Sequence, residues 1–143
     1  MVFENSPYII AIIVAWLGSH IIKSIFSCVK NEKRSFRQLF ASGGMPSSHS
    51  ASTVALATVV ALLNGVNSGL FGVAALFSMI VMYDAMKVRR SSGEQGSAIW
   101  ELIKEQKSNV RLPRVSKGHE PLEVFFGALL GLVIGIIVFL ATK

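Results

Sequence analysis

Small polar residues surround a histidine between Gly43 and Ser50, where the sequence Gly-Gly-Met-Pro-Ser-Ser-His-Ser leads into an apolar stretch. Paired glycines let the backbone approach a ligand closely, and the free amides of a helix start bind anions such as phosphate. Ser47 and Ser48 can add hydroxyl donors, and the His49 imidazole can exchange a proton near neutral pH. This segment therefore predicts a phosphate site with an acid or base beside it.

A second histidine occurs in Lys117-Gly118-His119-Glu120-Pro121-Leu122-Glu123, at the start of another apolar stretch. His119 and Glu123 are four residues apart, so in a helix they share a face. The carboxylate could then orient the imidazole, as a histidine nucleophile requires. An ordinary surface pair at a helix start, where the helix dipole favours glutamate, is the alternative.

Charged residues also end the apolar stretch that precedes Arg89 and Arg90. Asp84 lies about one turn inside it, where an ionised carboxylate is costly without a partner. Arg89 or Arg90 could be that partner, or could hold a phosphate with a planar guanidinium. A basic stop after a membrane helix explains the arginines but not Asp84, and a catalytic or a structural role for Asp84 stays open.

Three cations near the start of the chain, Lys23, Lys30 and Arg37, are spaced by seven residues. A continuous helix would align them on one face, where they could bind phosphate. Lys23 lies inside an apolar stretch and could instead extend its ammonium to the membrane surface. No carboxylate array demands a metal, so neither a metal nor another cofactor is expected.

These residues must be positioned by membrane helices, because 52% of the 143 residues are apolar and only 15% are charged. Four stretches approach the roughly 20 apolar residues that a bilayer crossing needs, at 8–29, 46–66, 68–87 and 121–141. A short interfacial helix is expected from Ser91 to Lys104, with Trp100 in the headgroup zone. We predict an all-α bundle of four transmembrane helices, in a single domain over 1–143.

The basic residues predict the orientation of this bundle. Eleven of the 14 fall in the segments 30–45 and 88–120, which four crossings place on one side together with Lys87 at a helix end, whereas Lys143 lies on the other side with both termini. Short loops rich in lysine and arginine stay in the cytoplasm. We therefore expect a multi-pass protein of the cell (inner) membrane, with the motif segments in the cytoplasm and both termini opposite.

Glycines recur every four residues at Gly127, Gly131 and Gly135. They give the last helix a smooth face for tight packing, either within the monomer or against another copy in a homo-oligomer. The sequence does not choose between these.

Three segments resemble the signatures of the divergent type 2 phosphatidic acid phosphatase-like membrane proteins. They are Gly-Gly-Met-Pro-Ser-Ser-His-Ser-Ala at 43–51, Asp-Ala-x-x-Val-Arg-Arg-x-x-Gly-Glu-Gln at 84–95, and Gly-His-x-Pro-x-Glu-Val-Phe-x-Gly at 118–127. That group is distantly related to the acid phosphatase and vanadium haloperoxidase superfamily. The resemblance implies a phosphatase-like membrane domain over nearly the whole chain.

The resemblance also implies roles for individual residues. His119 would be the nucleophile that becomes phosphohistidine, Glu123 its orienting carboxylate, and His49 the acid that protonates the leaving alkoxide. Ser47 and neighbouring amides would hold phosphate oxygens. The remaining phosphate-binding candidates are cations: Lys30 and Arg37, which have the spacing of the superfamily's first motif, Lys23 as a substitute ammonium, Arg114 before the histidine, and Arg89 and Arg90.

The function expected from these features is hydrolysis of a phosphomonoester or pyrophosphate on a membrane lipid. Phosphatidylglycerophosphate, phosphatidic acid and polyprenyl phosphates are the candidate substrates, and no nucleic-acid partner is expected. Two other classes of function remain as alternatives. One is a non-catalytic scaffold that binds lipid headgroups, and the other is a small transporter in which Lys23 and Asp84 line a polar path.

Overall fold

The computed structural model describes residues 6–29, 44–108, 110–112, 115 and 118–143. Its elements are α1 (Pro7–Val29), α3 (Ser48–Asn64), α4 (Gly69–Tyr83), the π-helical turn η1 (Asp84–Val88), α5 (Arg89–Glu105) and α6 (Pro121–Thr142). These residues contain helices and no β-strand, which confirms the all-α prediction.

The helices begin where the sequence offers a start signal. Ser47 and Ser68 cap α3 and α4 with their side-chain oxygens, and Pro121 occupies the first position of α6. A first helical turn leaves backbone N–H groups without partners. The two serine oxygens accept hydrogen bonds from such groups, and proline has no N–H group to leave unpaired. The predicted helices therefore lie within a few residues of their observed bounds.

Three segments are long and apolar enough to cross a bilayer: Pro7–Cys28, Gly69–Glu105 and Pro121–Thr142. Helix α3 is also apolar but has 17 residues. At about 1.5 Å per residue it is roughly 26 Å long, slightly less than a hydrocarbon core of about 30 Å. Three spans are thus present by length and composition, and a fourth crossing by α3 stays a prediction.

The helix expected from Ser91 to Lys104 corresponds to α5, but it is continuous with α4. Helices α4 and α5 join through η1 into one helical segment of 37 residues, Gly69–Glu105. No proline interrupts it, so the backbone hydrogen bonds continue through the π-helical turn. The predicted helix is therefore present, with its first residue at Arg89 rather than Ser91, and its position at the membrane interface stays a prediction.

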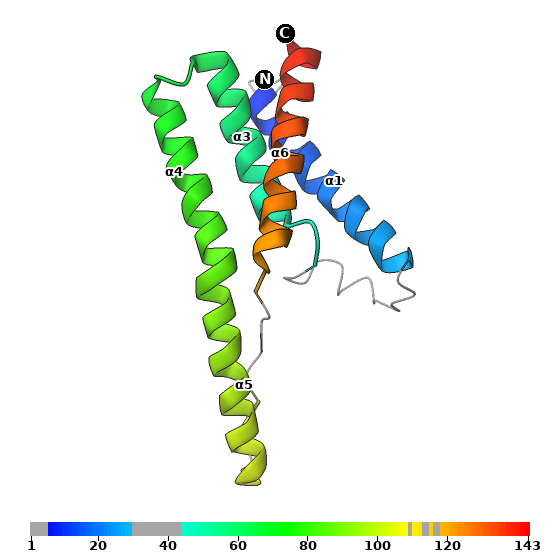
Figure 1. Cartoon of the computed structure of the whole chain (residues 1–143), viewed down its shortest axis with the longest axis vertical. Helices are drawn as coiled ribbons and strands as arrows, with labels where there is room; N and C mark the ends of the chain where they lie inside the picture. Colours follow the sequence, from blue (N-terminus) through cyan, green and yellow to red (C-terminus); the bar gives the residue numbers. More distant parts are fainter. Residues whose placement is uncertain (1–5, 30–43, 109, 113–114, 116–117) are drawn as a thin grey trace.

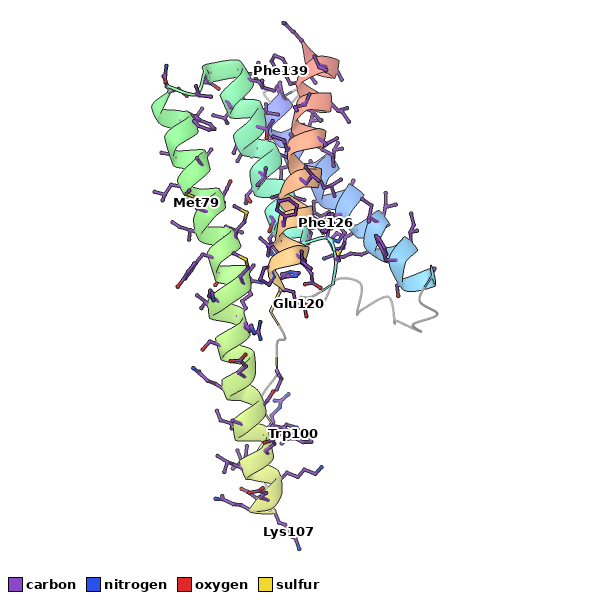
Figure 2. All side chains as sticks on the ribbon, in the orientation of Figure 1. Met79, Trp100, Lys107, Glu120, Phe126 and Phe139 are labelled. Atoms are coloured by element: carbon purple, nitrogen blue, oxygen red, sulfur yellow. The ribbon has the colours of Figure 1, made fainter. Side chains whose placement is uncertain are left out.

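Helix α3 lies in the middle of the bundle and contacts α6, α1 and α4 (Figure 1). The start of α1, the turn between α3 and α4, and the end of α6 lie at one end, where the Tyr8 hydroxyl donates to Asn64 Oδ1 at 2.7 Å. At the other end α5 extends beyond the other helices and carries Trp100 and Lys107 away from the bundle, while Glu120 marks the start of α6 (Figure 2). The three motif segments share this second end.

The glycine face of α6 packs against α3 of the same chain. A Cβ atom added at Gly131 would lie 2.3 Å from the Ala51 carbonyl oxygen, and one added at Gly127 would lie 2.5 Å from the Ser47 carbonyl oxygen. Helix α3 thus fills the space that a partner helix would need. Of the two uses predicted for Gly127, Gly131 and Gly135, the structure shows packing within the monomer, and a homo-oligomer stays a prediction.

The bundle buries small and polar residues and exposes large apolar ones. One stripe of α1, with a residue every four positions, is buried throughout: Ala11, Ala15, Ser19, Lys23 and Ser27. Large apolar side chains on the outer faces of α1, α4 and α6 are exposed, including Ile21, Val73 and Leu140. This distribution suits a surface solvated by lipid.

Candidate active site

The first turn of α3 is fastened to α6 by its own capping residue. The Ser47 hydroxyl accepts hydrogen bonds from the Ser50 amide at 3.4 Å and from the Ser50 hydroxyl at 3.0 Å. The Ser47 amide donates to the Glu123 carbonyl at 2.9 Å. Ser47 is fully buried and joins the two helices, and its contact with a phosphate stays a prediction.

Lys23 and Ser48 meet between α1 and α3. The Lys23 ammonium donates to the Ser48 hydroxyl at 3.4 Å, and Lys23 is only 8% exposed. Of the two orientations predicted for this lysine, the structure shows the one that turns into the bundle. A positive charge is thereby held beside the start of α3.

The π-helical turn η1 gives Asp84 its partner. The Arg89 Nε–H donates to Asp84 Oδ2 at 2.7 Å, and the Arg89 amide donates to the Asp84 carbonyl. Residues five apart point about 140° away from each other on an α-helix, whereas a π-helix brings them together. The wider turn therefore allows this ion pair and aligns both side chains.

Arg90 takes a different direction from its neighbour. Its Nε–H donates to Glu94 Oε1 at 3.1 Å, and both side chains are largely exposed. The backbone of Arg90 instead contacts Gly118, where an added Cβ would lie 2.8 Å from the Arg90 nitrogen. The structure thus assigns Arg89, and not Arg90, as the partner of Asp84, and it places the Arg90 side chain outside the cluster.

His119 is held from both sides at the start of α6. Its amide donates to the Ala85 carbonyl in η1 at 3.0 Å, and its Nδ1 lies 2.8 Å from Glu123 Oε2. The same glutamate oxygen accepts the Glu120 amide at 3.3 Å as part of the capping box of α6. His119 is only 2% exposed, and its contacts with η1 and α6 hold it in place.

His49 lies near titratable side chains that come from the other elements of the site. It lies in the first turn of α3 and is exposed, unlike the serines on either side of it. Four titratable side chains from other elements lie within electrostatic range of its imidazole: Arg89, His119, Lys23 and Asp84. The three polar segments of the sequence, together with Lys23, therefore form one cluster.

Three predicted phosphate-binding residues, Lys30, Arg37 and Arg114, lie outside the described residues. Within the described part of the chain, no group of three or more histidine, cysteine, aspartate or glutamate side chains could hold a metal ion. The described cluster consists of two histidines, two carboxylates, two cations and the Ser48 hydroxyl. Such a set can bind an anion and move protons beside it.

Sequence reasoning missed two positions that place His119. Gly118 adopts a φ of +65° and packs on the Arg90 backbone, and Ala85 supplies the carbonyl that accepts the His119 amide. The glycine before the histidine was a signal for Gly118, since glycine adopts positive φ at little cost. No signal in the sequence identified Ala85, because only its backbone acts.

The chain is similar to known sequences over almost its whole length. A family model described as the Divergent PAP2 family matches residues 3–134. A relative from Bacillus subtilis (strain 168), described as uncharacterized membrane protein YuiD, is 34% identical over 148 residues, which cover 93% of this chain and 93% of the relative. No solved structure matches the chain significantly. These matches confirm the resemblance carried by the three motifs, and the chain is a membrane protein that belongs to the Divergent PAP2 family.

Proposed function

We propose that the protein is a lipid phosphatase that removes a phosphomonoester or pyrophosphate group from a membrane lipid. The observation that supports this best is the 2.8 Å contact between His119 Nδ1 and Glu123 Oε2. If Glu123 is ionised it only accepts hydrogen bonds, so Nδ1 of a neutral His119 would carry the proton and Nε2 would keep its lone pair. An imidazole held in that tautomer is a nucleophile.

In the proposed first step on a phosphomonoester, His119 Nε2 attacks the phosphorus and the bond between phosphorus and the lipid oxygen breaks. The negative charge of a bound phosphate favours the imidazolium form of His49, and this imidazolium gives its proton to the departing alkoxide, which leaves as the lipid alcohol. The phosphoryl group stays on His119 as phosphohistidine. Glu123 stabilises the positive charge that develops on the imidazole.

In the second step, water attacks the phosphohistidine. His49, now neutral, takes a proton from that water, and the bond between Nε2 and phosphorus breaks. Inorganic phosphate leaves, His119 Nε2 regains its lone pair, and His49 is protonated for the next cycle. Both steps use only side chains of the described cluster.

Two cations can balance the negative charge of the phosphoryl group. Asp84 engages the Nε–H of Arg89, and the guanidinium has four further N–H donors that can reach phosphate oxygens. Lys23, beside Ser48, adds an ammonium on the opposite side of α3. Charge held in place before the reaction stabilises the transition state most effectively.

The candidate substrates are phosphatidylglycerophosphate, phosphatidic acid and polyprenyl phosphates. We expect the protein to lie in the cell (inner) membrane. The distribution of basic residues predicts that the motif end of the bundle faces the cytoplasm. Phosphatidylglycerophosphate and phosphatidic acid are then presented to the site directly. A polyprenyl carrier would need its phosphate on the same leaflet.

The test is release of inorganic phosphate from each lipid by purified protein in detergent micelles. His119→Gln should abolish release, and a lipid labelled in its phosphate should transfer label to the unmodified protein but not to this variant. His20→Gln is the matched control, because that imidazole packs edge-on against the Trp16 ring, with the ring centroids 4.5 Å apart, and has no part in the proposed chemistry. Unchanged release by His119→Gln would contradict the proposed nucleophile.

A non-catalytic headgroup binder is the second candidate function. The burial of His119, whose side chain is 1% exposed, favours it, because a nucleophile must reach its substrate. Equilibrium binding of the same lipids, without phosphate release from any of them, would establish this alternative. A transporter, the third possibility considered from the sequence, has no further observation in its favour.

A further inference from the structure

An apolar groove of about 400 Å³ lies between α1, α3 and α4. Its lining includes Tyr8 of α1, Leu56 and Val60 of α3, and Leu70, Ala74 and Phe77 of α4. This volume lies within the range of roughly 300–1,000 Å³ that is typical of sites for small molecules. Nothing in the mechanism proposed above uses it.

The groove continues the face of α3 that carries His49. Leu56 follows His49 by seven residues and Val60 by eleven, and at 3.6 residues per turn all three fall on one side of the helix. The same holds on the facing helix, where Phe77 and Leu70 precede Asp84 by seven and fourteen residues. The polar cluster and the groove therefore lie at successive levels on the same side of α3, and between them the Ser78 hydroxyl of α4 donates to the Thr53 carbonyl of α3 at 3.0 Å.

The distance between the polar cluster and the groove is similar to the depth of one bilayer leaflet. The distance along α3 from His49 to Val60 is about 16 Å at 1.5 Å per residue. One leaflet of a hydrocarbon core is about 15 Å deep. A molecule with its phosphate at His49 and its tail at Val60 would thus extend one leaflet into the membrane.

The outer wall of the groove opens toward the bilayer. Leu70 and Phe77 are each more than half exposed, and Val73 on the same wall is 68% exposed. Charged side chains do not line the groove, so it offers nothing to a polar ligand. A hydrocarbon chain could enter sideways from the membrane without crossing a polar barrier.

We propose that this groove binds an acyl chain of the phosphorylated lipid, and that Ala74 sets the room available for it. The inference rests on the proposed function, because the phosphate at His49 and Arg89 is what holds the lipid in register. Helix α4 supplies both Asp84 and the groove wall, so headgroup and chain are recognised by the same two helices. The substrate class is accordingly a long-chain phospholipid and not a soluble phosphate ester.

The direct test is photolabelling with a phosphatidic acid that carries a diazirine near the end of one acyl chain. The label should map to the segments 56–60 and 70–77, and excess unlabelled phosphatidic acid should remove it while phosphatidylcholine should not. Label that both lipids remove equally, or that lies only on outer faces, would overturn the inference. This readout does not depend on hydrolysis.

Variants at the groove supply the second arm of the test. Ala74→Phe should lower specific labelling about tenfold, the loss expected when roughly two methylene groups leave an apolar site. Val73→Trp changes an exposed residue, so it should narrow the groove without disturbing the bundle. Leu76→Phe is the matched control, because Leu76 is 58% exposed on the same helix and does not line the groove. Equal labelling in Val73→Trp, Ala74→Phe and Leu76→Phe would overturn the inference.

The results also separate this inference from the proposed function. Specific groove labelling without phosphate release from any lipid would refute the phosphatase and support the lipid groove. If instead phosphate were released equally from long-chain phosphatidic acid and a two-carbon analogue, with no groove labelling, the phosphatase would stand and the groove would be refuted.

Discussion

The Asp84 carboxylate accepts a 2.7 Å hydrogen bond from Arg89 across a π-helical turn. This turn is also where the His119 amide docks, on the Ala85 carbonyl. One local departure from α-helical geometry thus both directs a cation and anchors the second histidine. π-Helical turns within α-helices are frequently found at functional sites.

The two adjacent arginines should behave differently when neutralised. Arg89→Gln is expected to lower kcat/KM for lipid phosphate roughly 10- to 100-fold, as for loss of a hydrogen bond to a charged group. Arg90→Gln removes a side chain that pairs with Glu94 on the exposed side, so its effect should be within about threefold. Steady-state phosphate release measures both, and equal losses would remove Arg89 from the phosphate site.

The negative charge of Glu123, beside His119, should be needed for turnover. Glu123→Gln keeps an oxygen that can accept the Glu120 amide, so α6 should still form, but it no longer stabilises a charged imidazole or selects the Nδ1–H tautomer. We expect turnover to fall roughly 10²- to 10⁴-fold. Glu120→Gln alters the other half of the same capping box and should leave turnover within a factor of about three. A similar fall in turnover in both variants would show that Glu123 acts only by capping the helix.

Close packing of α6 on α3 predicts a stability difference between two glycines. At Gly131 an added Cβ meets the Ala51 backbone at 2.3 Å, whereas at Gly72 in α4 nothing lies within 4 Å. Gly131→Ala should therefore destabilise the bundle by about 1–3 kcal/mol. Gly72→Ala should stabilise it by roughly 0.5–1 kcal/mol, because alanine has the higher helix propensity. Unfolding in detergent measures both, and a neutral Gly131→Ala would contradict the observed contact between α3 and α6.

Substitutions at two glycines with positive φ can distinguish the effect of backbone strain from the effect of a displaced His119. Gly118 (φ +65°) contacts the Arg90 backbone, whereas Gly65 (φ +83°) has open space around its Cβ position. Alanine at either site should cost about 1–3 kcal/mol of stability, because a side chain disfavours positive φ. Only Gly118→Ala should also reduce phosphate release, since it must shift His119, and equal activity in the two variants would show that this contact does not position the imidazole.

The orientation in the membrane is testable with single cysteines. In a Cys28→Ser background, Asn67→Cys lies in the turn between α3 and α4, and Ser92→Cys lies on α5 at the motif end. Because most of the basic residues belong to the motif end, a membrane-impermeant thiol reagent added to intact cells should label Asn67→Cys only. Labelling of Ser92→Cys should require permeabilised membranes. The reverse pattern would place the site on the outer face.

The positions of the helices were predictable from the sequence, because apolar length and start signals are local properties. Ser47, Ser68 and Pro121 cap or begin helices through contacts within four residues of themselves. Pairing of His119 with Glu123 was predictable for the same reason, since their spacing of four is a property of any helix. The shared end of the three motif segments was also predictable, because successive antiparallel helices bring every second connection to the same end of a bundle.

Contacts between helices were decided only by the tertiary structure. The sequence left Asp84 with two possible partners, and the π-helical turn selected Arg89 because it closes a separation of five residues. It likewise left Lys23 free to extend outward, and the fit of α1 against α3 turned that ammonium to Ser48. The sequence also did not specify which helix meets the glycine face, and in the structure α3 packs against it. In each case the sequence determined which groups needed a partner, whereas the partner depended on the distance between helices, which no local spacing encodes.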